Sequence, residues 1–267
     1  MSIVVSSAQL GRPMILGTAP AHGTRDTLHA FGAAASQEPG MTMGMIAAGR
    51  ENLSQRAYMR IRSSLIHSEL QPGQRLVLRP LAAELRLSPT PVREALLRLV
   101  SEQALTLDER GSAIVPVIGL DELREIIDIR CDLEGRAAAR AATQASLPEI
   151  EQIANLVDAF HAATQSGDRP TRLSRNADLH RIICRVARAP LILHILEGIW
   201  MRIGPVYALQ VEEPATARSP TAPHPYDQLV MALRARDADA AREAVIADVR
   251  QSSRWLERSL VASAPPE

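Results

Sequence analysis

The chain has 267 residues, which suits about two domains, and combines 46% hydrophobic residues with only 3% aromatic ones. So few aromatic side chains favour a core of Leu, Ile, Val and Ala between packed helices over a β-sandwich. Thirty arginines balance thirty acidic residues, and no lysine is present. The charge is unevenly placed, because residues 50–117 hold ten arginines against seven acidic residues, whereas residues 118–267 hold eighteen against twenty-one. This basic excess in residues 50–117 is weak support for a nucleic-acid contact there.

No apolar run approaches the roughly 18 residues of a membrane span, and no basic region precedes the apolar N-terminal stretch, so we expect neither a membrane helix nor a signal peptide. Cys131 and Cys184 lie in helical contexts and are expected to be buried thiols rather than a disulfide. The chain is therefore predicted to be cytoplasmic, with no membrane partner.

Residues 1–49 are rich in Gly, Ala, Ser, Thr and Pro without sustained periodicity, and we predict a disordered N-terminal extension there. A helical stripe follows and ends before the turn at 71–73; its apolar members are Leu53, Ala57, Tyr58, Ile61 and Leu65.

Residues 79–99 contain two short amphipathic helices separated by a tight break. The second one is expected to begin with Thr90 as its N-cap and Pro91 at the first helical position, and it carries Arg93 near its start. Its apolar positions fit one helical face without a miss: Val92, Ala95, Leu96, Leu99 and Val100. This pattern predicts a helix-turn-helix, whose second helix points its N-terminal end into the major groove of double-stranded DNA.

Two apolar segments, 105–107 and 113–117, flank a polar tip and predict a β-hairpin. Three helices followed by a hairpin indicate a winged helix-turn-helix over residues 50–118, with wing contacts to DNA at Arg110, Gly111 and Ser112. The alternative is a small helical domain with a β-ribbon and no DNA-binding role.

After Gly119 the pattern is helical throughout, with no strand signal. Helices are predicted near 121–144, 147–165, 171–187, 190–211, 225–236 and 238–260. The expected fold class is therefore mainly α, with an N-terminal winged helix-turn-helix and an all-α bundle of six to seven helices over residues 119–262.

The series of motifs resembles the GntR family of bacterial transcription regulators, in its FadR-like branch. The resemblance covers about residues 52–260 and is carried by Leu-Gln-Pro-Gly-Gln-Arg-Leu at 70–76, Ser-Pro-Thr-Pro-Val-Arg-Glu-Ala-Leu at 88–96, Arg-Cys-Asp-Leu-Glu at 130–134 and Ala-Leu-Arg-Ala-Arg-Asp at 232–237.

The resemblance implies a homodimer that binds a palindromic operator and a helical domain that binds a small metabolite, in most relatives as a repressor. The residues that match DNA-contact positions of the family are Arg79, Thr90, Arg93 and Gly111. Ser88, which opens the recognition motif, is also assigned to the interface, and Arg98 is expected to be a phosphate or surface contact. Many relatives have a further arginine where this chain has Pro89, which suggests a different operator preference.

In many relatives the helical domain holds a divalent metal with one Asp or Asn and three His, and the metal helps to bind a carboxylate effector. Asn176 and His180 match the first pair, whereas Tyr226 and Asp248 stand where the other two His are expected. His224 is a substitute only if the local turn shifts. Two alternatives stay open: a Zn-like ion on Asn176, His180 and Asp248, or a metal-free pocket.

In the metal-free alternative, an organic acid is contacted directly by polar side chains, including Arg130 together with Asn176, His180, Tyr226 and Asp248. A second class of function, a helical metal-dependent enzyme acting on a small acid around His180 and Asp248, is disfavoured. The sequence has no HExxH pair, no Glu-x-x-His pair, no nucleophile with a nearby base and no Gly-rich phosphate loop. A third alternative is an architectural DNA-binding protein whose helical bundle only dimerises.

Overall fold

The structure is a computed structural model that describes residues 43–209 and 223–262. Residues 1–42, most of the predicted N-terminal extension, lie outside the described part. The first group of elements is α1 (Met43–Ile66), β1 (Arg75–Leu76), α2 (Leu78–Leu85), α3 (Pro89–Ser101), β2 (Thr106–Leu107) and β3 (Ala113–Ile114). The second group is α4 (Leu120–Gln144), α5 (Leu147–Gln165), α6 (Arg169–Val186), α7 (Pro190–Tyr207), α8 (Pro225–Ala235) and α9 (Ala238–Ala262).

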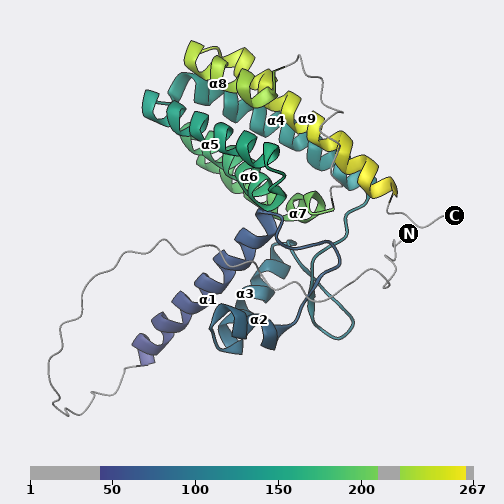
Figure 1. The fold of residues 1–267 in the computed structure, drawn as a ribbon. Helices are drawn as coiled ribbons and strands as arrows, with labels where there is room; N and C mark the ends of the chain where they lie inside the picture. Colours follow the sequence, from purple (N-terminus) through teal and green to yellow (C-terminus); the bar gives the residue numbers. More distant parts are fainter. Residues whose placement is uncertain (1–42, 210–222, 263–267) are drawn as a thin grey trace.

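The first group forms a winged helix-turn-helix, as the sequence predicts (Figure 1). The predicted stripe of α1 packs on α3: Ala57, Tyr58, Ile61 and Leu65 are buried, as are Val92 and Leu99. Residues 43–49, assigned above to the N-terminal extension, are helical and lengthen α1 by about two turns. The hairpin strands are shorter than predicted, and a strand that was not predicted, β1, pairs antiparallel with β3, so that the sheet order is β1-β3-β2.

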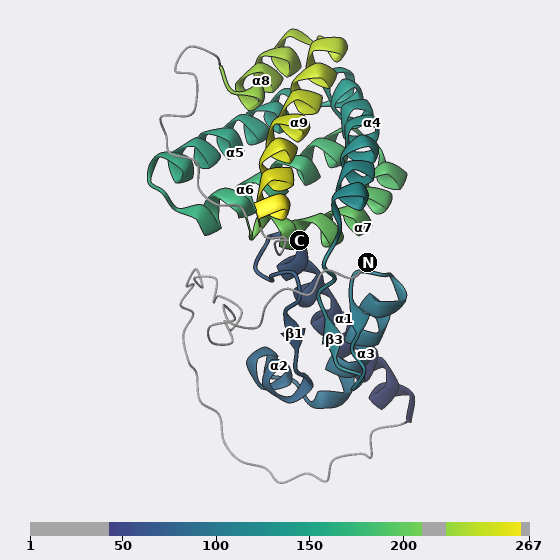
Figure 2. The same ribbon diagram turned by 90° about the vertical axis from the view of Figure 1, so that its right-hand side faces the viewer.

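The second group is an all-helical bundle above the winged part (Figures 1 and 2). Its helices agree with the predicted ranges to within a few residues. The most extensive packing joins α4 to α9, where α4 presents a run of fully buried small residues: Ala137, Ala138, Ala141 and Ala142. These small side chains let two long helices approach closely and form the centre of the bundle.

The two groups of elements meet where the C-terminal end of α1 packs against α7 (Figure 1). Cys131 and Cys184 are buried free thiols. Among the described helices, none has the length and apolar character needed to cross a membrane.

Candidate functional site

The DNA-reading face lies at the start of α3. The helix begins at Pro89 with Ser88 as its N-cap residue, so the expected start at Thr90 and Pro91 is wrong by two residues. Both prolines fit in the first turn because its N–H groups have no partner within the helix. Ser88, Thr90 and Arg93 are all exposed at this end. The structure therefore presents a hydroxyl pair and a guanidinium near the positive end of the helix dipole.

The two other predicted arginines of this region differ in their surroundings. Arg79 is exposed in the first turn of α2. Arg98 lies against α1: its guanidinium stacks 3.8 Å from the centroid of the Tyr58 ring and donates to Glu102 Oε1 at 3.0 Å and Gln55 Oε1 at 2.9 Å. Arg98 therefore buttresses the contact between α1 and α3, and only its exposed edge is available to a phosphate.

The wing tip is organised by Asp108. Its Oδ1 accepts the backbone N–H groups of Arg110 at 3.0 Å and Ser112 at 2.7 Å, and its Oδ2 pairs with Arg75 at 2.5 Å. The backbone N–H of Ser112 is the main cause that holds the pKa of Asp108 below its usual value. Gly111 has a φ of +75°, a conformation that side chains disfavour. The tip is thus a defined turn that exposes Arg110 and Gly111.

A second site lies inside the helical bundle, around a buried ion pair on α4. The Nε of Arg130 donates to Glu134 Oε1 at 2.6 Å, and both side chains are 2% exposed. Trp200 Nε1 donates to the same oxygen at 2.8 Å, and Arg130 Nη1 donates to the hydroxyl of Tyr207 at 2.8 Å. Burial opposes ionisation of Glu134, but Arg130 and His180 outweigh it and hold the pKa of this carboxyl far below its usual value.

His180 of α6 joins this ion pair to α9. Its Nδ1 lies 2.6 Å from Glu134 Oε2, and its Nε2 lies 3.4 Å from Asp248 Oδ2. Burial lowers the pKa of His180, but the charge of Glu134 and the contact with Asp248 outweigh it and raise the pKa to about 9. Arg130 and His180 therefore both lie against the buried carboxylate of Glu134, and His180 also approaches the side chain of Asp248.

Tyr226 of α8 completes the site. Its hydroxyl donates to Asn176 Oδ1 at 2.6 Å and lies 3.2 Å from His180 Nε2. The residue is fully buried, and burial is the main cause that raises the pKa of its hydroxyl well above the usual value. The five residues predicted to bind the effector are thus brought into one connected network: Arg130, Asn176, His180, Tyr226 and Asp248.

This arrangement does not fit a divalent metal. The hydroxyl of Tyr226 stands between Asn176 and His180, where an ion would have to contact both side chains. His224, the possible substitute ligand, instead caps the N-terminus of α8, because its Nδ1 accepts the N–H of Tyr226 at 3.1 Å. In residues 43–209 and 223–262 no cluster of three His, Cys, Asp or Glu side chains suits a metal.

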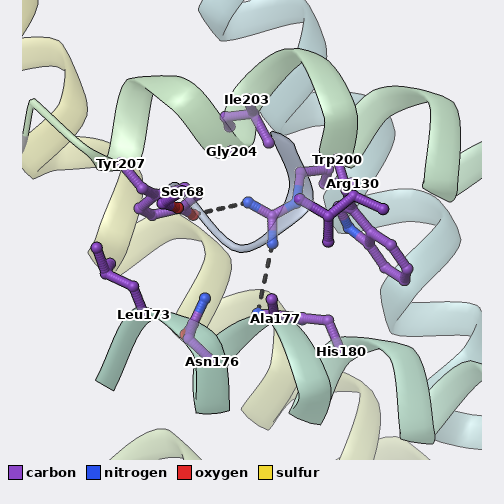
Figure 3. Close-up of a pocket in the computed structure, with 11 residues that line it drawn as sticks. Ser68, Arg130, Leu173, Asn176, Ala177, His180, Trp200, Ile203, Gly204 and Tyr207 are labelled. Carbon is purple, nitrogen blue, oxygen red and sulfur yellow. Dashed lines mark hydrogen bonds between the residues drawn. The ribbon is translucent and has the colours of Figure 1, made fainter. Parts of the chain in front are cut away.

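A pocket opens beside this network (Figure 3). Figure 3 shows the guanidinium of Arg130 at its centre, hydrogen-bonded to Tyr207 and facing His180. The cavity has a volume of about 20 Å³, which is room for one or two water molecules. Its lining comes from the bundle and from the end of α1: Ile66, Ser68, Arg130, Leu173, Asn176, Ala177, His180, Trp200, Ile203, Gly204 and Tyr207.

Three residues of this site were not predicted to belong to it: Glu134, Tyr207 and Trp200. Glu134 accepts from Arg130 and Trp200, and Tyr207 accepts from Arg130. A signal for Glu134 was present: it follows Arg130 by four residues on the apolar stripe of α4, where isolated charges are rarely buried. No comparable signal marks Trp200 or Tyr207, which differ from packing residues only through their partners.

A winged helix-turn-helix joined to a helical domain with a pocket beside a buried polar network is the architecture of a ligand-responsive transcription regulator. Comparisons with known proteins agree. Residues 53–115 match the model of bacterial regulatory proteins of the gntR family, and residues 125–251 match that of the FCD domain. The chain belongs to the GntR family, in the group that carries an FCD domain for effector binding.

The transcriptional regulator McbR of Escherichia coli is 33% identical over 186 residues, which are 69% of this chain and 83% of McbR. Its solved structure matches with a TM-score of 0.72 at 30% identity, covering 77% of this chain and 97% of that one. The gluconate operon repressor of Bacillus subtilis is 31% identical over 55% of this chain and 57% of its own length. A putative GntR regulator from Rhodococcus, at 17% identity and a TM-score of 0.62, shares the fold.

Proposed function

We propose that this regulator is a homodimeric repressor that acts in the cytoplasm, binds a palindromic operator and releases it in response to a small organic acid. The observation that carries the proposal is the exposed N-terminal end of α3, where Thr90 and Arg93 point to solvent at the end that faces bases in this class of domain. Arginine in this position binds guanine through the O6 and N7 atoms of the base. The phosphate backbone of the DNA is contacted by the remaining residues, which set the position of the domain along the duplex: Arg79, Ser88, Arg110, Gly111 and Ser112.

The dimer is supported by α7, whose outer face is apolar. Leu191 is 70% exposed and Ile195, one turn later, is 43% exposed. A Cβ added to Gly198, a further turn along, would meet no atom of another element within 4 Å, so the face is open to a close helix approach. A second copy that buries this face would pair two recognition helices, as a palindrome requires.

The effector is proposed to bind at the pocket beside Arg130, with Asn176, His180, Tyr226 and Asp248 as its polar surroundings. The buried guanidinium of Arg130, which lines the pocket, supports direct hydrogen bonds to a small acid. Because the ligand alters the balance between two dimer geometries, its effect on operator affinity is expected to be about 1–3 kcal/mol.

The test uses the DNA duplex that the protein selects from a random pool. Arg93→Ala should weaken binding to this duplex by at least about thirtyfold, because a base contact of about 1–3 kcal/mol is lost in each half-site. Arg98→Ala is the matched control, since it should weaken binding to selected and scrambled duplexes alike. Sedimentation should show the same dimer in both variants. A normal operator footprint by Arg93→Ala would remove the proposed reading residue.

A further inference from the structure

α6 and α7 each contact both the pocket and the C-terminal end of α1. On one face they carry residues of the effector site, Asn176 and His180 from α6 and Trp200 from α7. Asp178 of α6 lies between Asn176 and His180 in the sequence, and Glu197 of α7 precedes Trp200 by one turn. Both carboxylates contact α1 or the residue that follows it. Any shift of α6 or α7 around a ligand therefore also shifts the contacts made to the winged part.

One ion pair and one histidine–carboxylate contact join the winged part to these helices. Arg62 of α1 pairs with Glu197, and their side chains are only 13% and 16% exposed. His67, directly after α1, contacts Asp178 Oδ1 through its Nε2 at 3.3 Å. Burial opposes ionisation of Asp178, but the hydrogen bond from His67 outweighs it and lowers the pKa of the carboxyl. Both contacts are partly shielded from water, which strengthens them relative to surface pairs.

The end of α1 also forms part of the pocket wall. Ser68 closes α1 in a left-handed conformation with a φ of 62°, and the N–H of Glu69 returns to Ser64 O at 2.9 Å. This end rests directly on Gly204 of α7: a Cβ at that position would lie 2.0 Å from the carbonyl oxygen of Leu65. Only glycine allows this approach, which brings Ser68 to the rim of the pocket in Figure 3.

The cavity is too small for a metabolite, so one of its walls has to move when a ligand binds. Its volume is only about 20 Å³. On the side of the bundle, Arg130 and His180 are held by buried charge pairs. On the other side, the wall is the end of a helix that belongs to the DNA-binding part, with Ser68 presenting a hydroxyl to the ligand.

We propose that the effector site is composite: Ile66 and Ser68 of the DNA-binding part form one of its walls, and the contacts of Arg62 with Glu197 and of His67 with Asp178 carry the ligand signal to α1. This inference rests on the proposed function. It assigns Ser68 as a ligand contact and Gly204 as the residue that seats α1 against the site.

The link is tested without knowing the effector, because coupling between two sites is reciprocal: DNA bound to the winged part must alter the effector site. Trp200, whose Nε1 bonds to Glu134, is the reporter. The protein is labelled with 5-fluorotryptophan in a Trp255→Phe background, and the ¹⁹F resonance of Trp200 is followed while the selected duplex is added. We expect the duplex to shift this resonance.

The double variant Asp178→Asn with Glu197→Gln should lose the shift while still binding the duplex. Glu122→Gln is the matched control, since it removes the ion pair between Glu122 of α4 and Arg202 of α7, both within the bundle, and it should keep the shift. A shift that persists in the double variant, or is absent from the unaltered protein at saturating duplex, overturns the inference. Failure to select or bind any duplex would instead refute the proposed function.

Discussion

Replacing Glu134 by Gln is predicted to destabilise the protein more than any exposed charge change. The Glu134 carboxylate accepts from Arg130 and Trp200 and lies 2.6 Å from His180 Nδ1, at 2% exposure. The neutral amide has the same shape but leaves the buried guanidinium of Arg130 without its paired carboxylate. Breaking a buried pair in this way costs about 3–5 kcal/mol, whereas a partly exposed pair contributes about 0–1 kcal/mol.

The assay is thermal unfolding at neutral pH, followed by circular dichroism. For a domain of this size, each kcal/mol lowers the midpoint by roughly 2–4 °C, so Glu134→Gln should unfold roughly 10 °C below the unaltered protein. Glu122→Gln, which breaks a pair with Arg202 whose side chains are 36% and 31% exposed, should unfold within about 3 °C of it. Equal midpoints for the two variants would show that Glu134 does not neutralise buried cations.

Two further predictions concern pH and assembly. The folded pKa of His180 is raised from 6.5 to about 9, so the stability that its protonation contributes is complete below pH 6.5 and is lost as pH rises through 9. Denaturant unfolding should therefore show that the free energy of unfolding falls by roughly 3 kcal/mol between pH 6.5 and 9.5. A His180→Gln variant with the same pH dependence would contradict this assignment. Ile195→Asp, which places a charge on the exposed apolar face of α7, should change the sedimenting species from dimer to monomer. A dimer that persists in this variant would show that the interface is not on this face.

Most of the fold follows from periodicity, whereas parts of the site do not. The helices of the bundle have long apolar stripes, and their predicted ranges agree closely with the structure. β1 was missed because a strand of two residues, Arg75 and Leu76, is too short to show alternation. The start of α3 was placed at Thr90 because its polar side chain suits an N-cap, although Ser88, with the same chemistry, has that role.

The buried polar network around His180 was predicted from the sequence only where a family motif marked its residues. Tyr226 and Asp248 were located by spacing, and the structure brings both to His180. The contact of Gly204 with the end of α1 could not be predicted, because a glycine inside an apolar helix carries no sign of what approaches it. Contacts between separate parts of a chain depend on their relative placement, which local patterns do not encode.

Sequence-specific DNA reading by α3 underlies the whole proposed function, and competition between duplexes is its sharpest test. Binding of the duplex selected from a random pool is measured at about 0.15 M salt against increasing amounts of a scrambled duplex of the same length and composition. We expect a preference of about a thousandfold or more for the selected palindrome, as is typical of specific regulators. A preference below about tenfold would mean that binding is electrostatic only, and would contradict the assignment of α3 as a recognition helix.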